Sequence, residues 1–531
     1  MRTSVPEGRV RRLRSRGDFF QMKRFLVSCS RALILAMAGL AFAAGVVPPF
    51  AGGDDDAAPG KASRGIVSHP PLVTSKAATR DIAFAEARPV LQTFSDELPA
   101  DLQGLSAEEL KKEWPDYVRR HDSEIRKRLL QGDEDSLVNL LLFGTSFTAQ
   151  PRITGEFLSQ AKQQPKAATA QKPGEDLLSR VLAARVSDLI AALAAPGENE
   201  RLQYMRRLLE HKGLTFGTPA ARDKVRQYFA DGVKRVGSEF DEYRKAIEAA
   251  HATGDASTEF AARSTLYQKR GISLDTSIMP DYALEEALKL LLKRGLMTKG
   301  SVRHVAVIGP GLDFTDKQEG YDFYPQQTTQ PFAVIDSLLR LGLAREGDLQ
   351  VTTFDISPRV NQHLALIRQR AGTGSPYVLQ LPLRKDKSWE SGAKAFWEHL
   401  GEFVGSPAQP AVVPASVGKL DIRAVRVKPE IVLQVVPIDT NIVWQRQDLA
   451  ADRRYDLVVA TNILVYYDEF QQALALDNLQ SMIRESGFLL TNNGLPEVPT
   501  LEMRQIGYSS TAYSDRSADG DHIIWYQHSA R

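Results

Sequence analysis

The feature that most constrains the fold of this chain is a change of pattern at residue 303. From there on, short runs of β-branched and apolar residues alternate with amphipathic stretches of helical period. Such alternation is typical of a parallel sheet built from β-α units. It predicts an α/β domain over residues 300–531.

The predicted strands and helices of this domain alternate regularly until an insertion after the second helix. Strands are predicted at His304–Ile308, Gln350–Phe354, Ile431–Val436, Asp456–Thr461 and Phe488–Thr491. Helices are predicted at Gln330–Leu341, Pro358–Arg370 and Asp468–Arg484, with a further helix near 388–403 in the insertion. Two runs at the end, 507–514 and 522–529, predict a terminal antiparallel pair.

Residues 83–299 have helical periodicity instead. Ser106 and Glu109 have the spacing of a capping box at the start of one helix. In another, Leu284, Leu288, Leu291 and Leu292 fall on one face. The sequence therefore predicts an all-α domain that precedes the sheet.

The amino-terminal residues 1–50 differ in charge from the rest of the chain. The formal net charge of the 531 residues is +2, but residues 1–50 hold nine Lys and Arg against two acids. The remainder, with 58 basic and 63 acidic side chains, is mildly acidic. This body gives no indication of nucleic-acid binding.

The basic residues precede an uncharged apolar run, Ala32–Val47, and small residues at Ala41 and Ala43 offer a cleavage site. A basic region, an apolar run and a small-residue site are typical of a secretory signal. The run has 16 residues, short of the roughly 20 of a spanning helix. We expect a signal peptide or signal anchor over 1–50, a disordered linker over 51–82, and membrane contact through the amino-terminal segment only. A buried apolar helix of a cytoplasmic protein is the alternative.

Metal and disulfide chemistry find no support in the sequence. The one cysteine, Cys29, excludes an internal disulfide framework and a multi-cysteine metal site. The nine histidines show no ligand spacing. No metal site is predicted.

Chemistry-bearing residues follow the ends of the predicted strands. The first strand runs into a Gly-x-Gly turn at Gly309 and Gly311, where the backbone can approach a ligand at the carboxyl edge of the sheet. Phe314 replaces the third glycine of a dinucleotide fingerprint. The second strand leads to Asp355, an acid that can accept hydrogen bonds from both hydroxyls of a ribose.

The segment 315–329, between the glycine turn and the next helix, is longer than a compact unit requires. We expect it to be an active-site loop. Its Tyr321, Phe323 and Tyr324, with Asp322, could cover a cationic ligand because aromatic faces attract cations. A loop packed for structure is the alternative.

Taken together with VPIDTN at 436–441, YDLVVATNILVYYD at 455–468 and the SGFLL run at 486–490, these motifs resemble the class I S-adenosylmethionine-dependent methyltransferases. They occur in the order of that family, and the terminal hairpin matches its reversed last strand. The run ATNILVYYD is also similar to the fourth motif of chemoreceptor-type protein carboxyl methyltransferases. The resemblance covers about 300–531. It implies a Rossmann-like, seven-stranded methyltransferase sheet with terminal antiparallel strands.

The resemblance also implies roles for particular residues. Gly309 and Gly311 would form the turn beside the methionine moiety of S-adenosyl-L-methionine, and Asp313 would lie near its ammonium. Asp355, with Ile356 beside it, would hold the ribose. Asp439 would face the adenine amino group, unless Thr440 or Asn441 sets that loop. Asn462 would sit close to the transferring methyl group.

A methyltransferase of this kind needs few catalytic groups, because the sulfonium is an activated donor and the protein mainly orients and desolvates the reactants. A base is needed only for a poor nucleophile. The candidates are Tyr466, Tyr467 and Asp468 after the fourth strand, or Asp322 and Tyr324 in the loop. Helix-start packing is the alternative for the two tyrosines after the strand. The polar stretch 267–276 could fold over the site or simply connect two domains.

Three functions are consistent with these patterns. The first is methyl transfer to an unidentified acceptor, a small molecule or a protein. The second is a non-catalytic, methyltransferase-like binding or scaffold protein of the cell envelope, since an exported domain would meet little of a cytosolic cofactor. The third, a nucleotide-dependent oxidoreductase, is disfavoured by Phe314 and by the terminal strand pair.

Overall fold

The computed structural model describes residues 79–163, 176–253, 267, 270–274, 276, 278–313, 320–492, 494–515 and 519–529. The predicted signal, 1–50, lies outside these residues, and so does most of the predicted linker. The linker's last part is ordered, because Thr79–Asp81 form strand β1. Within the described residues, no helix has the length and apolar character needed to cross a membrane.

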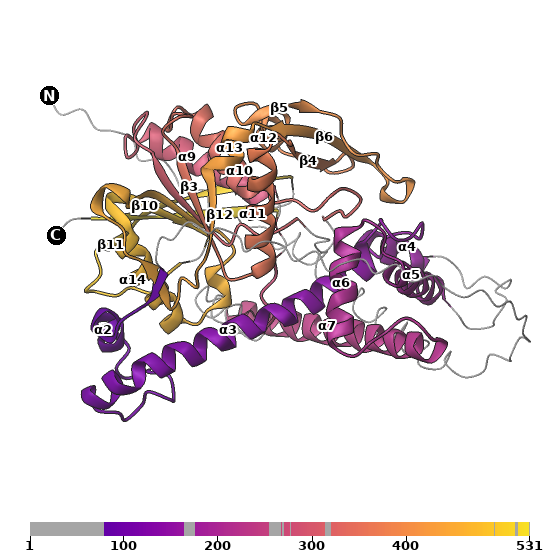
Figure 1. The fold of residues 1–531 in the computed structure, drawn as a ribbon, viewed down its shortest axis with the longest axis horizontal. Coiled ribbons are helices and arrows are strands. Elements are labelled where there is room, and N and C mark those ends of the chain that lie inside the picture. The colour runs from indigo at the N-terminus through magenta and orange to yellow at the C-terminus, as the bar shows by residue number, and fades with distance from the viewer. Residues whose placement is uncertain are drawn as a thin grey trace, which may run out of the picture.

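A seven-stranded sheet forms the centre of the α/β part of the molecule, to the left in Figure 1. Its strand order is β11-β12-β10-β9-β2-β3-β7. The strands are β2 (His304–Ile308), β3 (Gln350–Asp355), β7 (Val435–Asp439), β9 (Tyr455–Ala460), β10 (Ile483–Thr491), β11 (Met503–Ala512) and β12 (Gly520–His528). The pairs among β7, β3, β2, β9 and β10 are parallel, and β12 runs antiparallel to both β10 and β11. This is the predicted Rossmann-like sheet with a reversed strand in its terminal hairpin, so the predicted fold class is confirmed.

Helices cover both faces of this sheet. The chain steps in one direction from β2 through α10 (Gln330–Arg340) to β3 and through α11 (Pro358–Gly372) to β7. It steps in the opposite direction from β9 through α14 (Glu469–Met482) to β10. Because such crossovers are right-handed, α14 lies on the face opposite to α10 and α11. The helix before the sheet, α9 (Met279–Lys293), packs on α10, β11 and β12.

One predicted strand is misplaced. Residues 431–434, predicted as the start of the third parallel strand, belong to the short helix α13 (Pro429–Gln434), and the strand begins at Val435. Pro429 stands at the first position of this helix, where its missing N–H costs nothing. Ile431 and Val432 are buried in either conformation, and a short apolar run does not distinguish a strand from a buried helical turn.

The insertion after α11 forms a second, small sheet. Its strands are β4 (Tyr377–Arg384), β5 (Gly405–Ala408) and β6 (Leu420–Val427), paired antiparallel in the order β4-β6-β5. Helix α12 (Ser391–His399) lies within the region predicted to be helical. A third sheet pairs β1 with β8 (Gln445–Gln447). Three short 3-10 turns complete this part, at Ala415–Val417, Ala451–Arg453 and Leu464–Tyr466.

The preceding part of the chain is helical, as predicted. Its helices are α2 (Phe84–Thr93), α3 (Ala107–Phe143), α4 (Gly155–Gln163), α5 (Leu177–Ala194), α6 (Glu200–His211) and α7 (Pro219–Thr253). Ser106 caps α3, and Glu109 bonds back to the Ser106 amide, which is the predicted capping box. The predicted apolar face of α9 is also confirmed, since Leu284, Leu288 and Leu291 are buried.

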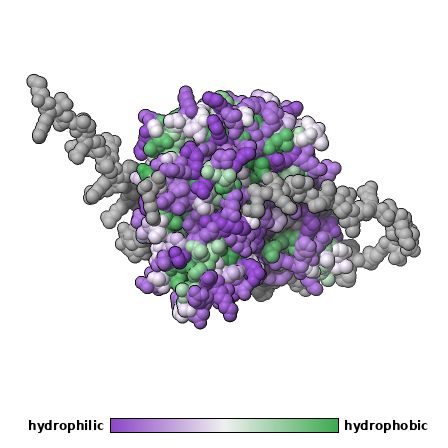
Figure 2. All heavy atoms as spheres, turned by 60° about the vertical axis from the view of Figure 1, so that its left-hand side comes forward, coloured by the Kyte–Doolittle hydropathy of each residue, from purple (hydrophilic) through white to green (hydrophobic). Residues whose placement is uncertain are grey.

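These helices are divided between two hydrophobic cores. One core surrounds the large sheet and includes α2, the first half of α3 and α9. The other lies among α3, α5, α6 and α7. Helix α3 contributes Trp114–Leu129 to the first core and Leu137–Leu142 to the second. It runs as one long element past the sheet and alongside α7 (Figure 1). On the face drawn in Figure 2, hydrophilic side chains dominate, and apolar ones are scattered among them.

Candidate functional site

The glycine turn after β2 has a backbone conformation that residues with a side chain rarely adopt. Gly309 and Gly311 have φ values of 61° and 66°, in the left-handed region that favours glycine. The Gly309 amide donates to the Phe354 carbonyl at 2.8 Å, which ties the turn to the end of β3. A Cβ on Gly309 would lie 2.2 Å from the Ile463 side chain, and one on Gly311 would lie 2.6 Å from the Leu274 carbonyl. The turn is therefore packed closely by this chain's own residues.

Asp355 ends β3 directly beside this turn. Its carboxylate accepts a hydrogen bond from the Ser357 amide at 2.7 Å, and the Gly311 amide also bonds to it. The side chain is buried, and this burial raises the pKa of Asp355 to about 7 despite the two amides. A carboxyl desolvated in this way gains when a hydroxyl donor reaches its remaining lone pairs.

Asp439 lies opposite Asp355 at the end of the next strand. The two are partners in the parallel register of β3 and β7. The Asp439 side chain is 54% exposed and forms an ion pair with Arg126 of α3 at 2.8 Å. Arg126 also pairs with Asp122 at 2.9 Å and donates to the Ile356 carbonyl at 3.2 Å. One guanidinium thus spans the ends of both strands.

The two residues after Asp439 have structural partners. The Thr440 hydroxyl lies 3.2 Å from that of Thr79 in β1. The Asn441 amide group donates to Asp122 at 2.8 Å, and its oxygen accepts from the Val443 amide. Thr440 and Asn441 are both buried, whereas the Asp439 side chain is half exposed. Of the three residues proposed to set the adenine loop, Asp439 is the one accessible to a ligand.

Asn462 follows β9 with a φ of 60°, which is uncommon for a residue with a side chain. Its amide donates to the Asn492 oxygen at 2.8 Å, and the Asn492 side chain donates back to the Asn462 oxygen. Asn492 comes directly after β10, so this pair joins the carboxyl ends of two neighbouring parallel strands. Asn462 is exposed there. Strained backbone held by its surroundings is concentrated at functional sites.

The residues after Asn462 are fixed by packing and by helix capping. Tyr467 is buried, and this burial raises the pKa of its hydroxyl, with Asp355 among the charges it experiences. Tyr466 is partly buried, and its ring makes an edge contact with Tyr267 at 5.8 Å between centroids. Asp468 caps α14 by accepting from the Gln471 amide at 2.7 Å. Asp468, one of the candidate bases, is therefore engaged in capping a helix.

The polar stretch before α9 runs directly against the glycine turn. The Leu312 amide donates to the Leu274 carbonyl at 2.8 Å, and the Ile272 amide donates to the Arg128 carbonyl of α3 at 3.0 Å. The Arg128 side chain bonds to the carbonyls of Tyr267, Arg270 and Tyr466. The described part of the stretch is thus held between α3 and the glycine turn, and both interpretations, a cover and a connection, remain predictions. Asp275 lies outside the described residues.

Asp322, in the predicted loop between the glycine turn and α10, does not have the expected role. The Asp322 carboxylate accepts hydrogen bonds from the amides and hydroxyls of Thr145 and Ser146, at 2.6–3.1 Å, just after α3. Four donors satisfy this carboxylate, so it fastens the loop to the helical core and does not face a ligand. Phe314–Glu319 lie outside the described residues.

Asp313, which the resemblance would place near the ammonium of the cofactor, is bonded to side chains of the loop. Its carboxylate accepts from the Tyr324 hydroxyl at 2.6 Å and from the Gln327 amide at 2.9 Å. Burial and the adjoining Asp313 raise the pKa of the Tyr324 hydroxyl, so Tyr324 is a donor and not the base considered for it. Arg201 of α6 donates to the carbonyls of Asp313 and Tyr324 and thereby holds both ends of the loop.

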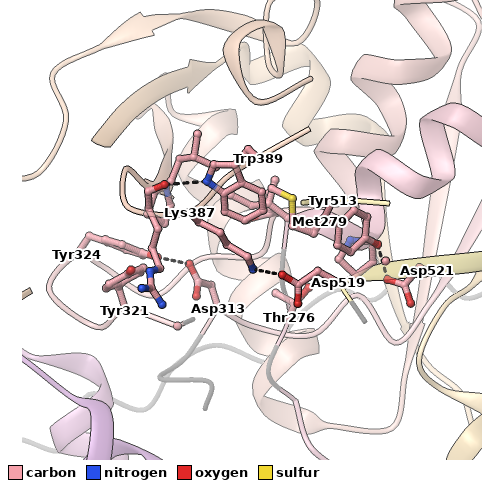
Figure 3. A pocket seen from close by; sticks show the side chains of 18 residues that line it. Thr276, Met279, Asp313, Tyr321, Tyr324, Lys387, Trp389, Tyr513, Asp519 and Asp521 are labelled. Carbon is pink, nitrogen blue, oxygen red and sulfur yellow. Dashed lines mark hydrogen bonds and ion pairs between the residues drawn. The ribbon is translucent and has the colours of Figure 1, made fainter. Parts of the chain in front are cut away.

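A cavity of about 310 Å³ opens beside Asp313 (Figure 3). Its walls come from the start of α9, the loop before α10, the end of β4 and the tip of the β11–β12 hairpin. The side chains labelled in Figure 3 include Asp313, Tyr321, Tyr324, Lys387, Trp389, Tyr513, Asp519 and Asp521. Among the described residues, no group of three or more His, Cys, Asp and Glu side chains could hold a metal ion.

Sequence reasoning missed the arginines and acids that α3 contributes. Asp122, Arg126 and Arg128 reach the site from more than 200 residues before β3, and long-range packing of this kind leaves no local signal. The one available clue was the four-residue spacing of Asp122 and Arg126, which suits an ion pair on a helix surface. Such a pair is far more often a solvated surface feature than part of a site.

Comparison with known proteins gives structural neighbours only. No protein-family model matches the chain, and no curated protein matches it. Among solved structures, the N-methyltransferase NodS from Bradyrhizobium japonicum WM9 is 13% identical, with a TM-score of 0.22, covering 46% of this chain and 93% of its own. The glycopeptide N-methyltransferase MtfA, solved with sinefungin, is 12% identical, with a TM-score of 0.19, covering 46% and 66%. The O-methyltransferase NcsB1 from neocarzinostatin biosynthesis is 13% identical, with a TM-score of 0.24, covering 69% and 100%.

The topology identifies the fold. The strand order, the parallel pairs and the reversed strand in the terminal hairpin form a class I methyltransferase fold. The candidate site lies at the carboxyl edge of this sheet. Two carboxyls, one buried and one exposed, stand side by side at the ends of β3 and β7 and next to a glycine turn. Hydroxyl and amino donors are the groups such carboxyls bind.

Proposed function

We propose that this chain is an S-adenosylmethionine-dependent methyltransferase with an unidentified acceptor. The observation that carries the proposal is the register of Asp355 and Asp439 at the carboxyl ends of adjacent strands, beside the turn at Gly309 and Gly311. In open α/β sheets this edge is where ligands bind. The acceptor's nature and the chain's location in the cell remain predictions from the sequence.

The cofactor would supply an activated methyl group on its sulfonium. The chain's own residues would hold and orient it. Asp355 would accept hydrogen bonds from the ribose hydroxyls, and Asp439 would accept one from the adenine amino group. Arg126 is a positioning residue in this arrangement, because it fixes Asp439 and the Ile356 carbonyl together. Asn462, exposed at the end of β9, would face the transferring methyl group.

The proposal does not depend on a catalytic base that removes a proton from the acceptor. Of the two tyrosines proposed as catalytic, Tyr467 is the buried one that lies near Asp355. With a raised pKa, it is a hydrogen-bond donor at neutral pH and not a base. Tyr466 lies at the end of a short 3-10 turn, where its carbonyl accepts from Arg128 at 2.9 Å. The proposed catalysis therefore rests on orientation and desolvation.

Calorimetric titration of the full-length chain with S-adenosylmethionine tests the proposal. We expect binding by the wild type, weakened about tenfold or more by Asp355→Asn, because an amide offers one acceptor oxygen where a carboxylate offers two. Asp348→Asn is the matched control, since Asp348 is exposed two residues before the opposite end of the same strand. An unchanged affinity in Asp355→Asn would contradict the assignment. Absence of binding to the wild type would favour the non-catalytic binding protein.

A further inference from the structure

The cavity beside Asp313 is built from parts that the α/β fold does not require. Pro382–Arg384 belong to the inserted sheet, and Trp389 precedes the inserted helix α12. Asp519–Asp521 lie at the tip of the terminal hairpin. The insertion and the terminal hairpin, which are far apart in the sequence, thus converge on one space, and an isolated bridge between Trp389 and Ser514 joins them.

Aromatic rings form much of the wall. Tyr321, Tyr324, Trp389 and Tyr513 all line the cavity (Figure 3). Tyr321 and Tyr324 are held by the arginines of the helical core, with the Arg152 guanidinium 4.7 Å from the Tyr321 ring centre. Aromatic faces attract cations, and cages of them are a known way of binding organic ammonium groups.

Acidic groups outnumber basic ones among the lining residues. Asp313, Asp519 and Asp521 line the cavity, together with Arg384 and Lys387. Arg384 makes two hydrogen bonds to Asp386, at 2.8 and 2.9 Å, so an acid outside the lining already compensates its charge. The Asp521 carboxylate accepts from the Tyr513 hydroxyl, a neutral donor. Among the lining side chains alone, one acid is in excess.

Lys387 shows how an alkylammonium fits these walls. Its amino group lies 4.5 Å from the centre of the Trp389 ring and 3.1 Å from Asp519. The Asp519 carboxylate also accepts from the Ser514 hydroxyl at 2.6 Å. An indole face and a hydrogen-bonded carboxylate thus already bind one ammonium group inside the cavity. A ligand's ammonium group would meet the same kind of surroundings at Asp521 and Tyr513.

A buried hydrogen bond ties the wall of the cavity to the end of β9, where methyl transfer is proposed. Thr329, at the start of α10, lines it, and the neighbouring Gln330 donates to the Thr461 hydroxyl at 2.8 Å. Thr461 precedes Asn462. On the other side, Pro280 lines the cavity and precedes Asp281, a carboxyl only 2% exposed. A further acid therefore stands directly behind the wall.

We propose that this cavity binds an organic amine in its cationic form, with the ammonium group between Asp521 and the aromatic wall. The inference rests on the proposed function in one respect, namely that the bound amine would be the methyl acceptor. In that transfer the amine would give a proton to a cavity carboxylate. Its nitrogen lone pair would then form the bond to the methyl carbon while the carbon–sulfur bond breaks, and that bond's electron pair would go to sulfur.

Three probes of equal size and different charge test the inference on the full-length chain. Benzylamine, benzyl alcohol and benzoate can be titrated by ligand-observed nuclear magnetic resonance without any cofactor. We expect benzylamine to bind about tenfold more tightly than either of the others, as cation–π and charge contacts together predict. Equal binding of benzoate or benzyl alcohol would overturn the proposal.

Substitutions in the hairpin tip locate the effect. Asp521→Asn should weaken benzylamine binding several-fold, whereas Asp515→Asn should leave it unchanged, since Asp515 is exposed in the same hairpin and does not line the cavity. Lys387→Met should strengthen it, because the variant frees the Trp389 face and leaves Asp519 without that lysine. A gain of affinity cannot result from misfolding. Unchanged binding in both Asp521→Asn and Lys387→Met would contradict the proposed position.

The same variants separate this inference from the proposed function. If the chain binds S-adenosylmethionine but no benzylamine, the cavity proposal fails and the methyltransferase proposal stands. If it binds benzylamine with the expected response to Asp521→Asn but no S-adenosylmethionine, the reverse holds. We expect Asp521→Asn to leave the affinity for S-adenosylmethionine unchanged, because Asp521 is not among the residues assigned to the cofactor.

Discussion

Asp281, on α9 behind the cavity wall, has a carboxyl whose ionisation should affect the stability of the whole molecule. Neither of its oxygens makes a hydrogen bond of normal geometry with the described residues, and burial raises its pKa from 3.8 to about 8. Between these two values the unfolded chain has this carboxyl ionised while the folded protein keeps it protonated. The folded protein therefore binds more protons, and its free energy of unfolding falls as the pH rises through this range.

Replacing this residue should remove that pH dependence. For Asp281→Asn we compare the free energy of unfolding with that of the wild type. The value for the variant minus that for the wild type should increase from pH 5 to pH 8. One such group contributes at most about 1.4 kcal/mol per pH unit. Urea unfolding at several pH values measures the difference, with Asp348→Asn as an exposed control. A constant difference across the range would mean that Asp281 is ionised in the folded state.

At the scale of single elements, the contact between α3 and the segment 270–274 depends on one glycine. A Cβ on Gly132 would lie 2.0 Å from the Ile272 carbonyl oxygen, and that atom belongs to a backbone which also packs on the glycine turn through Leu274. The helix and the segment cannot both keep their places if a side chain is added. Helix α3 can thus lie this close to the site because Gly132 has no side chain.

We expect Gly132→Ala to destabilise the protein by about 2–3 kcal/mol, because overpacking against backbone outweighs the gain in helix propensity. It should also weaken cofactor binding, since the segment that covers Gly311 must move. Gly372→Ala, in α11 with open space around the position, is the control and should change stability by less than about 1 kcal/mol. Equal stabilities of the two variants in urea unfolding would refute this account of the packing.

The elements that local sequence determines were predictable, and those that distant contacts determine were not. Strand β2 has the predicted bounds, and the helix predicted at Pro358–Arg370 is α11, which ends only two residues later. By contrast, nothing near Asp322 in the sequence indicated that its carboxylate would bind Thr145 and Ser146. A carboxylate in an aromatic loop looks the same in sequence whether it faces a ligand or the end of a helix.

At the scale of the whole molecule, the two cores are joined by buried charges. Arg359 of α11 forms an ion pair with Asp133 of α3, and its guanidinium lies 3.7 Å from the ring centre of Tyr204 in α6. The Tyr204 hydroxyl donates to the same carboxylate at 2.6 Å. Asp133 is 5% exposed, so its charge depends on these partners.

Arg359→Ala should therefore loosen the helical core from the sheet. We expect a loss of about 3 kcal/mol, because a buried carboxylate loses its cation, against less than about 1 kcal/mol for Arg226→Ala, whose pair with Asp223 is exposed. All five tryptophans lie outside the residues of the helical core. In Arg359→Ala, the thermal transition followed by circular dichroism should consequently begin at a lower temperature than the one followed by tryptophan fluorescence. In the wild type the two transitions should coincide. Coincident melting in the variant would show that the cores remain one cooperative unit.

The pairing of β1 with β8 also affects the order in which the molecule can assemble. Arg80 contacts Asp448 across 368 residues of sequence, with hydrogen bonds of 2.6 and 2.8 Å. During synthesis the first strand therefore has no partner until five-sixths of the chain has been made. Contacts between such distant residues are formed slowly, because the entropy of closing the loop must be lost before they form. The amino-terminal strand and α2 should thus be among the last elements to become protected from hydrogen exchange during refolding.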